Sequence, residues 1–163
     1  MIRACISFSF ALVLISQSLC YGTYKLALCA IFQDEAPYLK EWIEFHKLQG
    51  VEHFYLYNNH SEDDFHAVLD PYIESKEVTL VNWPFKYPYN DHAKWLRIQS
   101  AAYMDCILSI QDDVEWLVVI DTDEFLFCPD GMKVPQFLAN YTQYPGIAVN
   151  WIKFGTSGVW DIP

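Results

Sequence analysis

The chain has 163 residues, of which 53% are hydrophobic and 17% aromatic, so it can form one domain with a substantial core and does not have a disordered composition. Its formal net charge is −11, from 21 acidic and 10 basic residues, which leaves no basic stripe for a phosphate backbone and argues against nucleic acid as a partner. If the protein binds phosphate groups, a metal ion must supply the positive charge.

The first segment, residues 1–22, has the layout of a secretory signal peptide or a short N-terminal anchor. It combines an early base, Arg3, with an apolar run over residues 4–15 and small residues before Tyr24. The run is shorter than the roughly 20 residues of a membrane-spanning helix, which favours the signal peptide. A first core strand is the alternative, and the lack of alternating polar residues argues against it. We therefore expect a domain over residues 23–163 and a place in the secretory pathway: the Golgi lumen in a eukaryote, the cell envelope in a bacterium, with possible membrane association through the N-terminus.

Three cysteines follow this leader: Cys29, Cys106 and Cys128. Their odd number and the absence of a C-x-x-C spacing indicate neither a zinc site nor a disulfide framework. Asn59-His60-Ser61 and Asn140-Tyr141-Thr142 match the N-glycosylation pattern, which matters only in a eukaryotic secretory lumen.

The rest of the chain alternates between predicted strands and helices. Apolar runs without alternation predict strands buried on both faces, and apolar residues at helical spacing, with Pro37 near one start and Gly50 at one end, predict the helices. In chain order we expect strand 25–32, helix 37–50, strand 53–57, helix 65–72, strand 78–82, helix 93–110, strand 116–120, a short helix from 135 and strand 146–151. This order is typical of a single α/β domain. The chain then stops at W-D-I-P, so we expect the domain to be C-terminally incomplete.

The strand W-L-V-V-I delivers three carboxylates, Asp121, Asp123 and Glu124, within four positions. Like charges so close repel one another unless a cation or a shared proton lies between them. Residues two apart in extended chain project to one side, so Asp121 and Asp123 can face one hard cation together. The polar segments 33–35 and 58–64 also follow strands, and an α/β sheet gathers such segments at one edge. The alternative for an isolated D-x-D is a solvated strand end.

Three segments together resemble glycosyltransferase family 92. They are C-A-I-F-Q-D-E-A-P-Y-L-K-E-W-I-E-F-H at 29–46, G-V-E-H-F-Y-L-Y-N-N-H-S-E-D-D at 50–64 and W-L-V-V-I-D-T-D-E-F-L-F at 116–127, with F-G-T-S-G at 154–158 in the same pattern. The resemblance implies a GT-A fold, a Rossmann-like nucleotide-sugar-binding sheet with flanking helices. It also implies an inverting, Mn²⁺- or Mg²⁺-dependent transfer of a hexose, galactose by expectation, from a UDP-sugar to a glycan acceptor.

The resemblance also implies roles for individual residues. Asp121 and Asp123 match the family's D-x-D, with Asp121 near the ribose and the metal waters and Asp123 on the metal. Glu124 is expected to accept a hydrogen bond behind the metal, with Phe125 and Phe127 packed behind it. The residues expected to bind the nucleotide are Phe32, Asp34, Glu35, Asn58, Asp63 and Asp121.

Several assignments stay open. The catalytic base is unknown, because Asp161 is the one acid among the last thirty or so residues. Gln99 matches a family position that faces the donor, but a helix-surface glutamine is an equal alternative. His46 is expected to be a core histidine rather than a ligand. Trp83, Trp95 and Trp151 can stack on sugars or pack in the core.

Two other functions compete with the active transferase. One is a truncated, non-catalytic module that binds a sugar nucleotide or a glycan. The other is a phosphohydrolase of the haloacid dehalogenase type, which also places D-x-D after an apolar strand. That family needs further acids and a lysine downstream, and only Lys133 and Lys153 follow.

Overall fold

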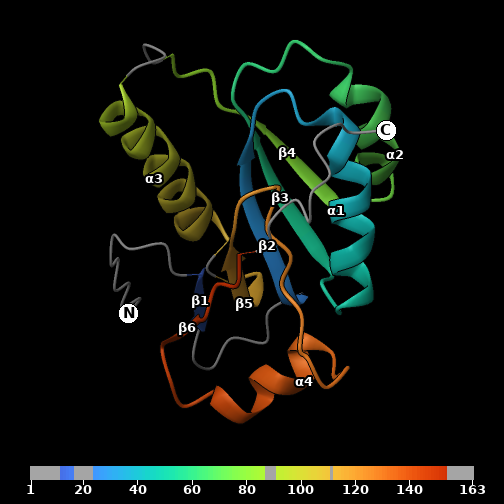
Figure 1. Ribbon diagram of the computed structural model, residues 1–163, viewed down its shortest axis with the longest axis vertical. Helices are drawn as coiled ribbons and strands as arrows, with labels where there is room; N and C mark the ends of the chain where they lie inside the picture. The colour runs from blue at the N-terminus through green and yellow to red at the C-terminus, as the bar shows by residue number, and fades with distance from the viewer. Residues whose placement is uncertain (1–11, 17–23, 87–90, 111, 154–163) are drawn as a thin grey trace.

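The computed structural model describes residues 12–16, 24–86, 91–110 and 112–153 (Figure 1). Its elements are β1 (Leu12–Ser16), β2 (Tyr24–Phe32), α1 (Ala36–Leu48), β3 (His53–Asn58), α2 (Phe65–Glu74), β4 (Val78–Asn82), α3 (His92–Ser109), β5 (Val114–Val119), α4 (Val134–Leu138), a 3₁₀ turn at Ala139–Tyr141 and β6 (Gly146–Val149). Every element that the sequence predicts is present within a few residues of its expected bounds. β1 was not expected.

The strands form one sheet in the order β4-β3-β2-β5-β1-β6. β2 pairs in parallel with β3 and β5, and β3 pairs in parallel with β4, whereas β1 is antiparallel to both β5 and β6. The register places Phe32 beside Asn58 and Asn58 beside Asn82, so β2, β3 and β4 end level with one another. Their carboxyl ends therefore open onto one edge, as the sequence analysis predicts.

Helices cover both faces of the sheet. α1 and α2 lie on one side and α3 on the other (Figure 1). Successive residues of β2 point to opposite faces, so Leu28 and Phe32 join the core under α1 and α2 while Cys29 and Ile31 join the core under α3. Burial on both faces accounts for the unbroken apolar sequence of this strand. The fold class is the expected one, α/β with a parallel sheet and flanking helices.

β1 lies within the segment that the sequence predicts to be a leader. Its residues pair with Trp116 to Val119 of β5 and with β6. An unbroken apolar run suits a signal peptide and an inner strand equally well, so its composition does not separate the two. Removal of the leader stays a prediction. None of the described helices is both long and apolar enough to span a bilayer.

Candidate functional site

The loops after β2 and β3 are joined to each other at the carboxyl edge of the sheet. Oδ1 of Asp34 accepts hydrogen bonds from the backbone N–H groups of Glu62 (2.6 Å) and Asp63 (3.3 Å). In return, Oγ of Ser61 accepts from the backbone N–H of Asp34 (3.0 Å), and Oδ2 of Asp63 accepts from that of Ala36 (2.7 Å). Asp34 adopts a left-handed backbone (φ 56°), which aims its carboxylate at the second loop. Both carboxylates expected near the nucleotide therefore help to build the loops.

Two polar atoms of the loop after β3 are buried without a hydrogen-bond partner among the described residues. They are Nε2 of His60 and Oδ1 of Asp63. Buried polar atoms are nearly always paired with protein, water or a ligand. This loop therefore has unused capacity to bind a polar group, while Oδ1 of its neighbour Asn58 is used by the backbone N–H of Ser61 (2.9 Å).

The D-x-D segment begins two residues after the end of β5. Asp121 and Asp123 are exposed and Thr122 between them is buried. Residues 121–124 form a turn and not the extended chain expected from the sequence, so strand alternation does not set the directions of the two carboxylates. Oδ1 of Asp121 accepts from Nε2 of Gln99 (2.9 Å) and from the hydroxyl of Tyr103 (3.1 Å), and no hydrogen bond to Oδ2 is made by the residues that the structure describes. Gln99 therefore faces the site. Sequence analysis missed Tyr103, although its position one turn after Gln99 puts both on one face of α3.

Glu124 closes a tight turn over Asp121. Oε2 of Glu124 accepts from the backbone N–H of Asp121 (3.0 Å), and the backbone N–H of Glu124 donates to the carbonyl of Asp121 (3.1 Å). Glu124 is thus a hydrogen-bond acceptor as expected, and the donor is the backbone of its own turn. This turn fixes the backbone on either side of Asp123.

The site is electrostatically unfavourable for its own carboxylates. The pKa of Glu35 is raised, first by lost hydration and then by the charge of Asp123 and of two acids in the adjoining loops. Lost hydration also raises the pKa of Asp121, although the residue keeps contact with solvent; the Tyr103 hydrogen bond opposes this and Asp123 adds to it. The pKa of Glu124 is raised in the same way, with Asp121 and Asp123 contributing. A bound cation would relieve all three.

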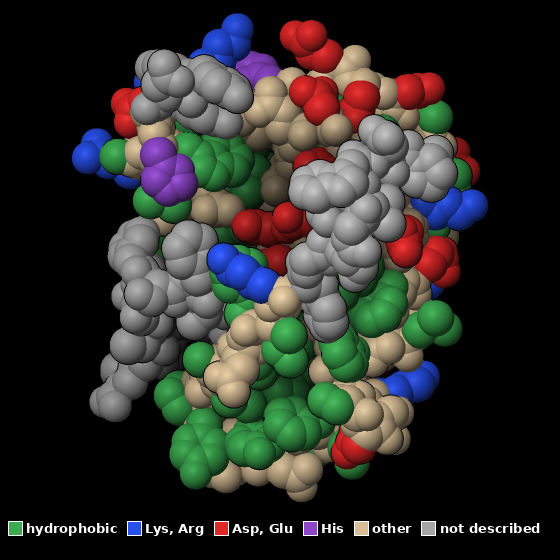
Figure 2. Space-filling model, in the orientation of Figure 1, with side chains coloured by type: hydrophobic (Ala, Val, Ile, Leu, Met, Phe, Trp, Pro, Cys, Tyr) green, Lys and Arg blue, Asp and Glu red, His purple; other side chains and the backbone are tan. Residues whose placement is uncertain are grey.

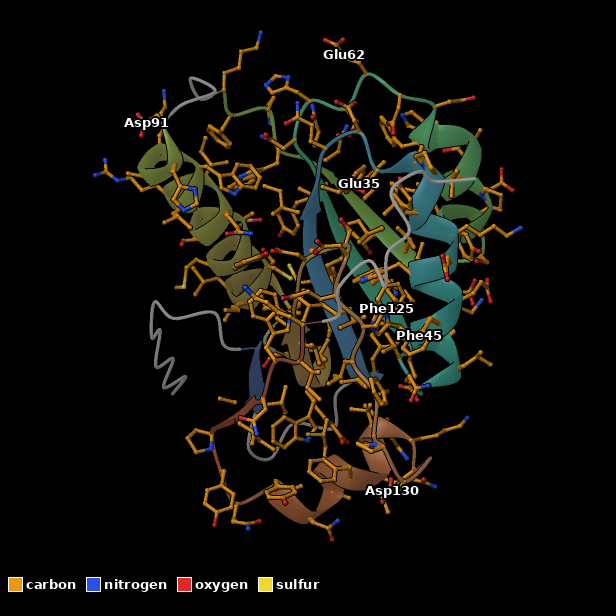
Figure 3. All side chains as sticks on the ribbon, in the orientation of Figure 1. Glu35, Phe45, Glu62, Asp91, Phe125 and Asp130 are labelled. Atoms are coloured by element: carbon orange, nitrogen blue, oxygen red, sulfur yellow. The ribbon has the colours of Figure 1, made fainter. Side chains whose placement is uncertain are left out.

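Acidic side chains also appear in the views of the whole molecule. Figure 2 shows Asp and Glu side chains within a hollow of one face, and Figure 3 shows Glu35 where β2 passes into α1. No group of three or more His, Cys, Asp or Glu side chains in the described parts of the chain is arranged to hold a metal ion. Two carboxylates are nevertheless enough for Mg²⁺ when phosphates and water complete its shell.

Phe32 and the two phenylalanines after Glu124 differ from expectation. The Phe32 ring is 2% exposed and packs edge-on against Phe65, so its side chain belongs to the core and only its backbone reaches the edge. Phe125 and Phe127 are 43% and 44% exposed instead of packed behind Glu124. Phe125 lies edge-on to Phe45, with ring centres 5.0 Å apart (Figure 3). These two rings help to line an open apolar cavity of about 410 Å³.

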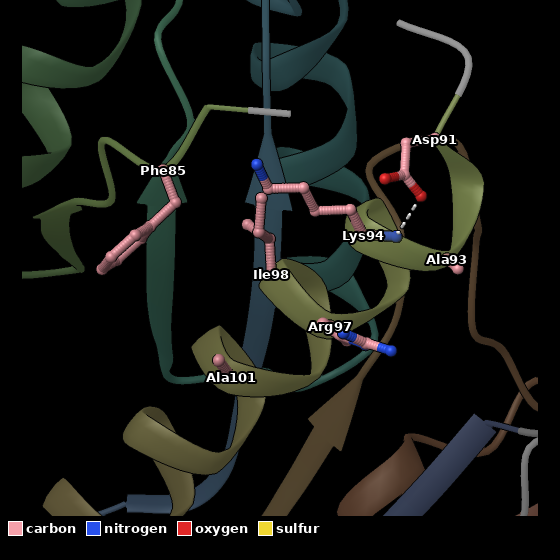
Figure 4. Close-up of a pocket in the computed structure, with 7 residues that line it drawn as sticks. All are labelled: Phe85, Asp91, Ala93, Lys94, Arg97, Ile98 and Ala101. Carbon is pink, nitrogen blue, oxygen red and sulfur yellow. Dashed lines mark hydrogen bonds between the residues drawn. The ribbon is translucent and has the colours of Figure 1, made fainter. Parts of the chain in front are cut away.

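A second cavity, of about 400 Å³, lies between the loop after β4 and the first turns of α3 (Figure 4). It is lined by Phe85, Asp91, Ala93, Lys94, Arg97, Ile98 and Ala101. Asp91 caps α3 by accepting from the backbone N–H of Lys94 (2.9 Å). Buried Asn59 holds the opposite wall, because its Nδ2 donates to the carbonyls of Trp83 (2.8 Å) and Phe85 (3.0 Å).

The remaining candidates divide between core and surface. Trp83 packs in the core under α3 and donates to the carbonyl of Ile98 (3.2 Å), and Trp95 packs against the same core, whereas Trp151 is 48% exposed. Asn140 is exposed, whereas Asn59 of the other glycosylation pattern is 1% exposed.

Comparison with known proteins agrees with these motifs. The profile of glycosyltransferase family 92 matches residues 24–161. A family 92 protein of Oryza sativa is 31% identical over 144 residues, which cover 86% of this chain and 23% of that protein, and one of Ricinus communis is 28% identical over 145 residues (86% and 24%). A β-1,4-galactosyltransferase of Caenorhabditis elegans is 31% identical over 108 residues (63% and 25%).

Among solved structures, S. aureus TarS (residues 1–349) matches with a TM-score of 0.47 at 11% identity, over 73% of this chain and 31% of that one. The chain spans about a quarter of the length of the curated relatives that it matches. The profile match extends over nearly the whole described chain, from β2 to beyond β6. The chain therefore belongs to glycosyltransferase family 92.

Proposed function

We propose that this chain forms the donor-binding part of an inverting glycosyltransferase that transfers a hexose, galactose by expectation, from a UDP-sugar to a glycan acceptor with the help of Mn²⁺ or Mg²⁺. The observation that carries the proposal is the set of mutually repelling carboxylates Glu35, Asp121 and Glu124 around exposed Asp123, at the edge where the loops after β2 and β3 meet. The named activity of the C. elegans relative supports galactose as the sugar.

Asp121 and Asp123 are the residues that would hold the metal. When bound, a divalent ion neutralises the negative charge that develops on the leaving diphosphate. Gln99 and Tyr103 keep one oxygen of Asp121 occupied and orient the other, and the turn closed by Glu124 fixes the backbone beside Asp123. The protein thus needs no basic residue at the diphosphate, in keeping with its net charge of −11.

The loop after β3 is the proposed nucleotide subsite. His60 and Asp63 each contribute a buried polar atom that lacks a partner among the described residues. A nucleoside offers both donors and acceptors to such atoms. Glu35 borders the same edge, where lost hydration and the charges of Asp123, Asp63 and Asp34 raise its pKa.

The test is a calorimetric titration of the protein with UDP, with and without Mn²⁺, using the parent and Asp123→Ala. We expect Mn²⁺-dependent binding in the parent and its loss in the variant, because one of two metal-binding carboxylates is removed. Asp130→Ala is the control, since Asp130 is an exposed acid beside α4, far along the molecule from Glu35 (Figure 3).

Equal affinity in Asp123→Ala and the parent would refute the metal assignment. UDP binding without conversion of a UDP-hexose would instead favour the donor-binding, non-catalytic module.

We further propose a secretory or membrane-associated location, in which exposed Asn140 rather than buried Asn59 would be the accessible glycosylation site.

A further inference from the structure

Helix α1 holds the backbone of residues 121–126, the D-x-D-E-F segment with the leucine after it, through two buried side chains. Nε1–H of Trp42 donates to the carbonyl oxygen of Glu124 (2.8 Å), and the backbone N–H of Leu126 donates to Nε2 of His46 (3.1 Å). Trp42 and His46 are four residues apart and therefore share one helix face. Glu124 and Leu126 are two residues apart, so the helix binds alternate backbone positions of the segment.

The hydrogen bonds fix the tautomer of His46. Nδ1 lies 2.8 Å from the carbonyl oxygen of Trp42, which can only accept, so Nδ1 carries a proton. Nε2 must then be unprotonated to accept from Leu126. Burial lowers the pKa of His46 to about 4, so the ring is neutral at physiological pH. The core histidine expected from the sequence is thus also an acceptor for a loop 80 residues away.

The two side chains have little freedom to move. Trp42 and His46 are both 0% exposed, and their rings meet edge-on with centres 4.7 Å apart. Trp42 also packs against Phe54 at 5.7 Å, and Phe125 stacks on the His46 ring at 5.9 Å and 12°. The segment is therefore attached to two fully buried, closely packed side chains.

This attachment continues to the acidic turn. The carbonyl of Glu124 is held by Trp42, while the side chain and N–H of the same residue bond the backbone of Asp121. Asp123 lies between these two fixed points. A change in the position of the Glu124 backbone would therefore move the exposed carboxylate beside it.

We propose that Trp42 and His46 are positioning residues that fix the direction of Asp123 and thereby set the affinity of the site for a metal-bound diphosphate. This inference rests on the proposed function, and neither residue touches the ligand. It gives a physical reason why E-W-I-E-F-H and D-x-D-E-F occur together in this chain: each segment completes the hydrogen bonding of the other.

The experiment compares two variants that remove one bond each. Trp42→Phe keeps an aromatic ring but loses the N–H donor, and His46→Met keeps the length of the side chain but loses the acceptor. We expect the Kd for UDP in saturating Mn²⁺ to rise about fivefold to tenfold in each, as for one lost buried hydrogen bond. His46→Gln can again offer an oxygen to Leu126 and should recover most of the affinity.

Leu69→Ala is the matched control, because Leu69 is 0% exposed in the same core under α1 and α2 but belongs to α2 and makes no bond to the segment. It should lower the melting temperature without changing Kd at temperatures where it is folded. An equal rise of Kd in Leu69→Ala, or none in Trp42→Phe and His46→Met, would overturn the inference while the proposed function stands.

Amide hydrogen exchange distinguishes a failure of the proposed function from a failure of the positioning contact. In the parent, the Leu126 amide should exchange slowly, and in His46→Met it should exchange at least about tenfold faster, since its acceptor is gone. This measurement needs no ligand. A parent that protects Leu126 but does not bind UDP would reject the proposed function and with it the effect on affinity; fast exchange in the parent would reject the positioning contact itself.

Discussion

The D-x-D segment is held from both sides of the sheet, and the two sides hold it differently. On the α3 side, Gln99 and Tyr103 bond the carboxylate of Asp121. On the α1 side, Trp42 and His46 bond backbone atoms. Bonds to a carboxylate stabilise its ionised form and so alter its pKa, whereas bonds to the backbone fix position whatever the side chain is.

This difference separates two tasks that an acidic site requires. The charge of the site must be available to a cation, and the carboxylates must be preorganised so that binding does not have to order them. The α3 side acts on the first and the α1 side on the second. Three experiments, on the pH dependence of stability, on Gly50 and on Tyr103, test how the α1 side and the α3 side support the segment.

The largest expected effect concerns His46 and pH. Its pKa falls from 6.5 to about 4 on folding, so the unfolded chain binds more protons between these values. Neutral, buried His46 therefore stabilises the folded state. Its contribution to the free energy of unfolding is fully present above pH 6.5 and is lost as the pH falls through 4. A shift of this size corresponds to about 3 kcal/mol. Denaturant unfolding of the parent between pH 7 and pH 4 measures it.

His46→Gln is the control, because it keeps an acceptor but cannot titrate. The raised pKa values of Glu35, Asp121 and Glu124 act in the opposite sense, since the folded state then binds more protons and gains stability as pH falls. Both proteins contain these acids, so the difference between the two pH profiles isolates His46. Identical profiles would show that His46 is not a neutral, buried acceptor.

The second experiment tests whether the C-terminal end of α1 is held in place by its close contact with α4. Gly50 follows α1 with φ +98°, and an added Cβ would lie 2.9 Å from Cδ of Pro135 in α4. Gly50→Ala should therefore lower the free energy of unfolding by about 1–3 kcal/mol through backbone strain and this contact. Thermal unfolding followed by circular dichroism measures the change.

Gly131→Ala provides the comparison for this variant. Gly131 also has a positive φ (78°), but an added Cβ would meet nothing within 4 Å. Gly131→Ala should therefore introduce backbone strain alone and lower the free energy of unfolding by less than Gly50→Ala does. Equal losses in the two variants would mean that the close approach of Gly50 to Pro135 does not contribute to stability.

Sequence analysis predicts the fold well because local patterns determine most of it. Apolar runs and helical spacing identify the elements, and the rule that loops gather at the carboxyl edge of a parallel sheet places segments 33–35, 58–64 and 121–123 together. β1 is the exception. Its antiparallel pairing with β5 joins residues about a hundred positions apart, and no local pattern indicates such a partner.

The contacts within the site were harder to predict. The bond from Trp42 to Glu124 spans 82 residues and the bond from Tyr103 to Asp121 spans 18, and both depend on how the helices pack on the sheet. Phe32, by contrast, could have been assigned to the core. It has the same parity in β2 as buried Leu28, so it must face the same side of the sheet.

The smallest expected effect is a change of charge without a change of position. Tyr103→Phe removes the hydroxyl that donates to Oδ1 of Asp121 but keeps the ring in the core under α3. Because that bond lowers the pKa of Asp121, its loss should raise the pKa further, while Gln99 still donates to the same oxygen. The free energy of unfolding should change by about 1 kcal/mol or less. A metal-free NMR titration of the Asp121 carboxyl carbon measures the pKa.

Trp42→Phe is the matched variant for this titration, because it also removes one hydrogen bond to the segment and also keeps an aromatic ring. It should leave the pKa of Asp121 close to the parental value, since the lost bond ends on the Glu124 carbonyl and not on a carboxylate. The Leu126 amide should respond in the opposite pattern, with faster exchange in His46→Met, which removes its acceptor, and parental exchange in Tyr103→Phe. If the α1 variants and Tyr103→Phe changed both readouts alike, α1 and α3 would act as one support, and charge and position at the D-x-D turn could not be altered separately.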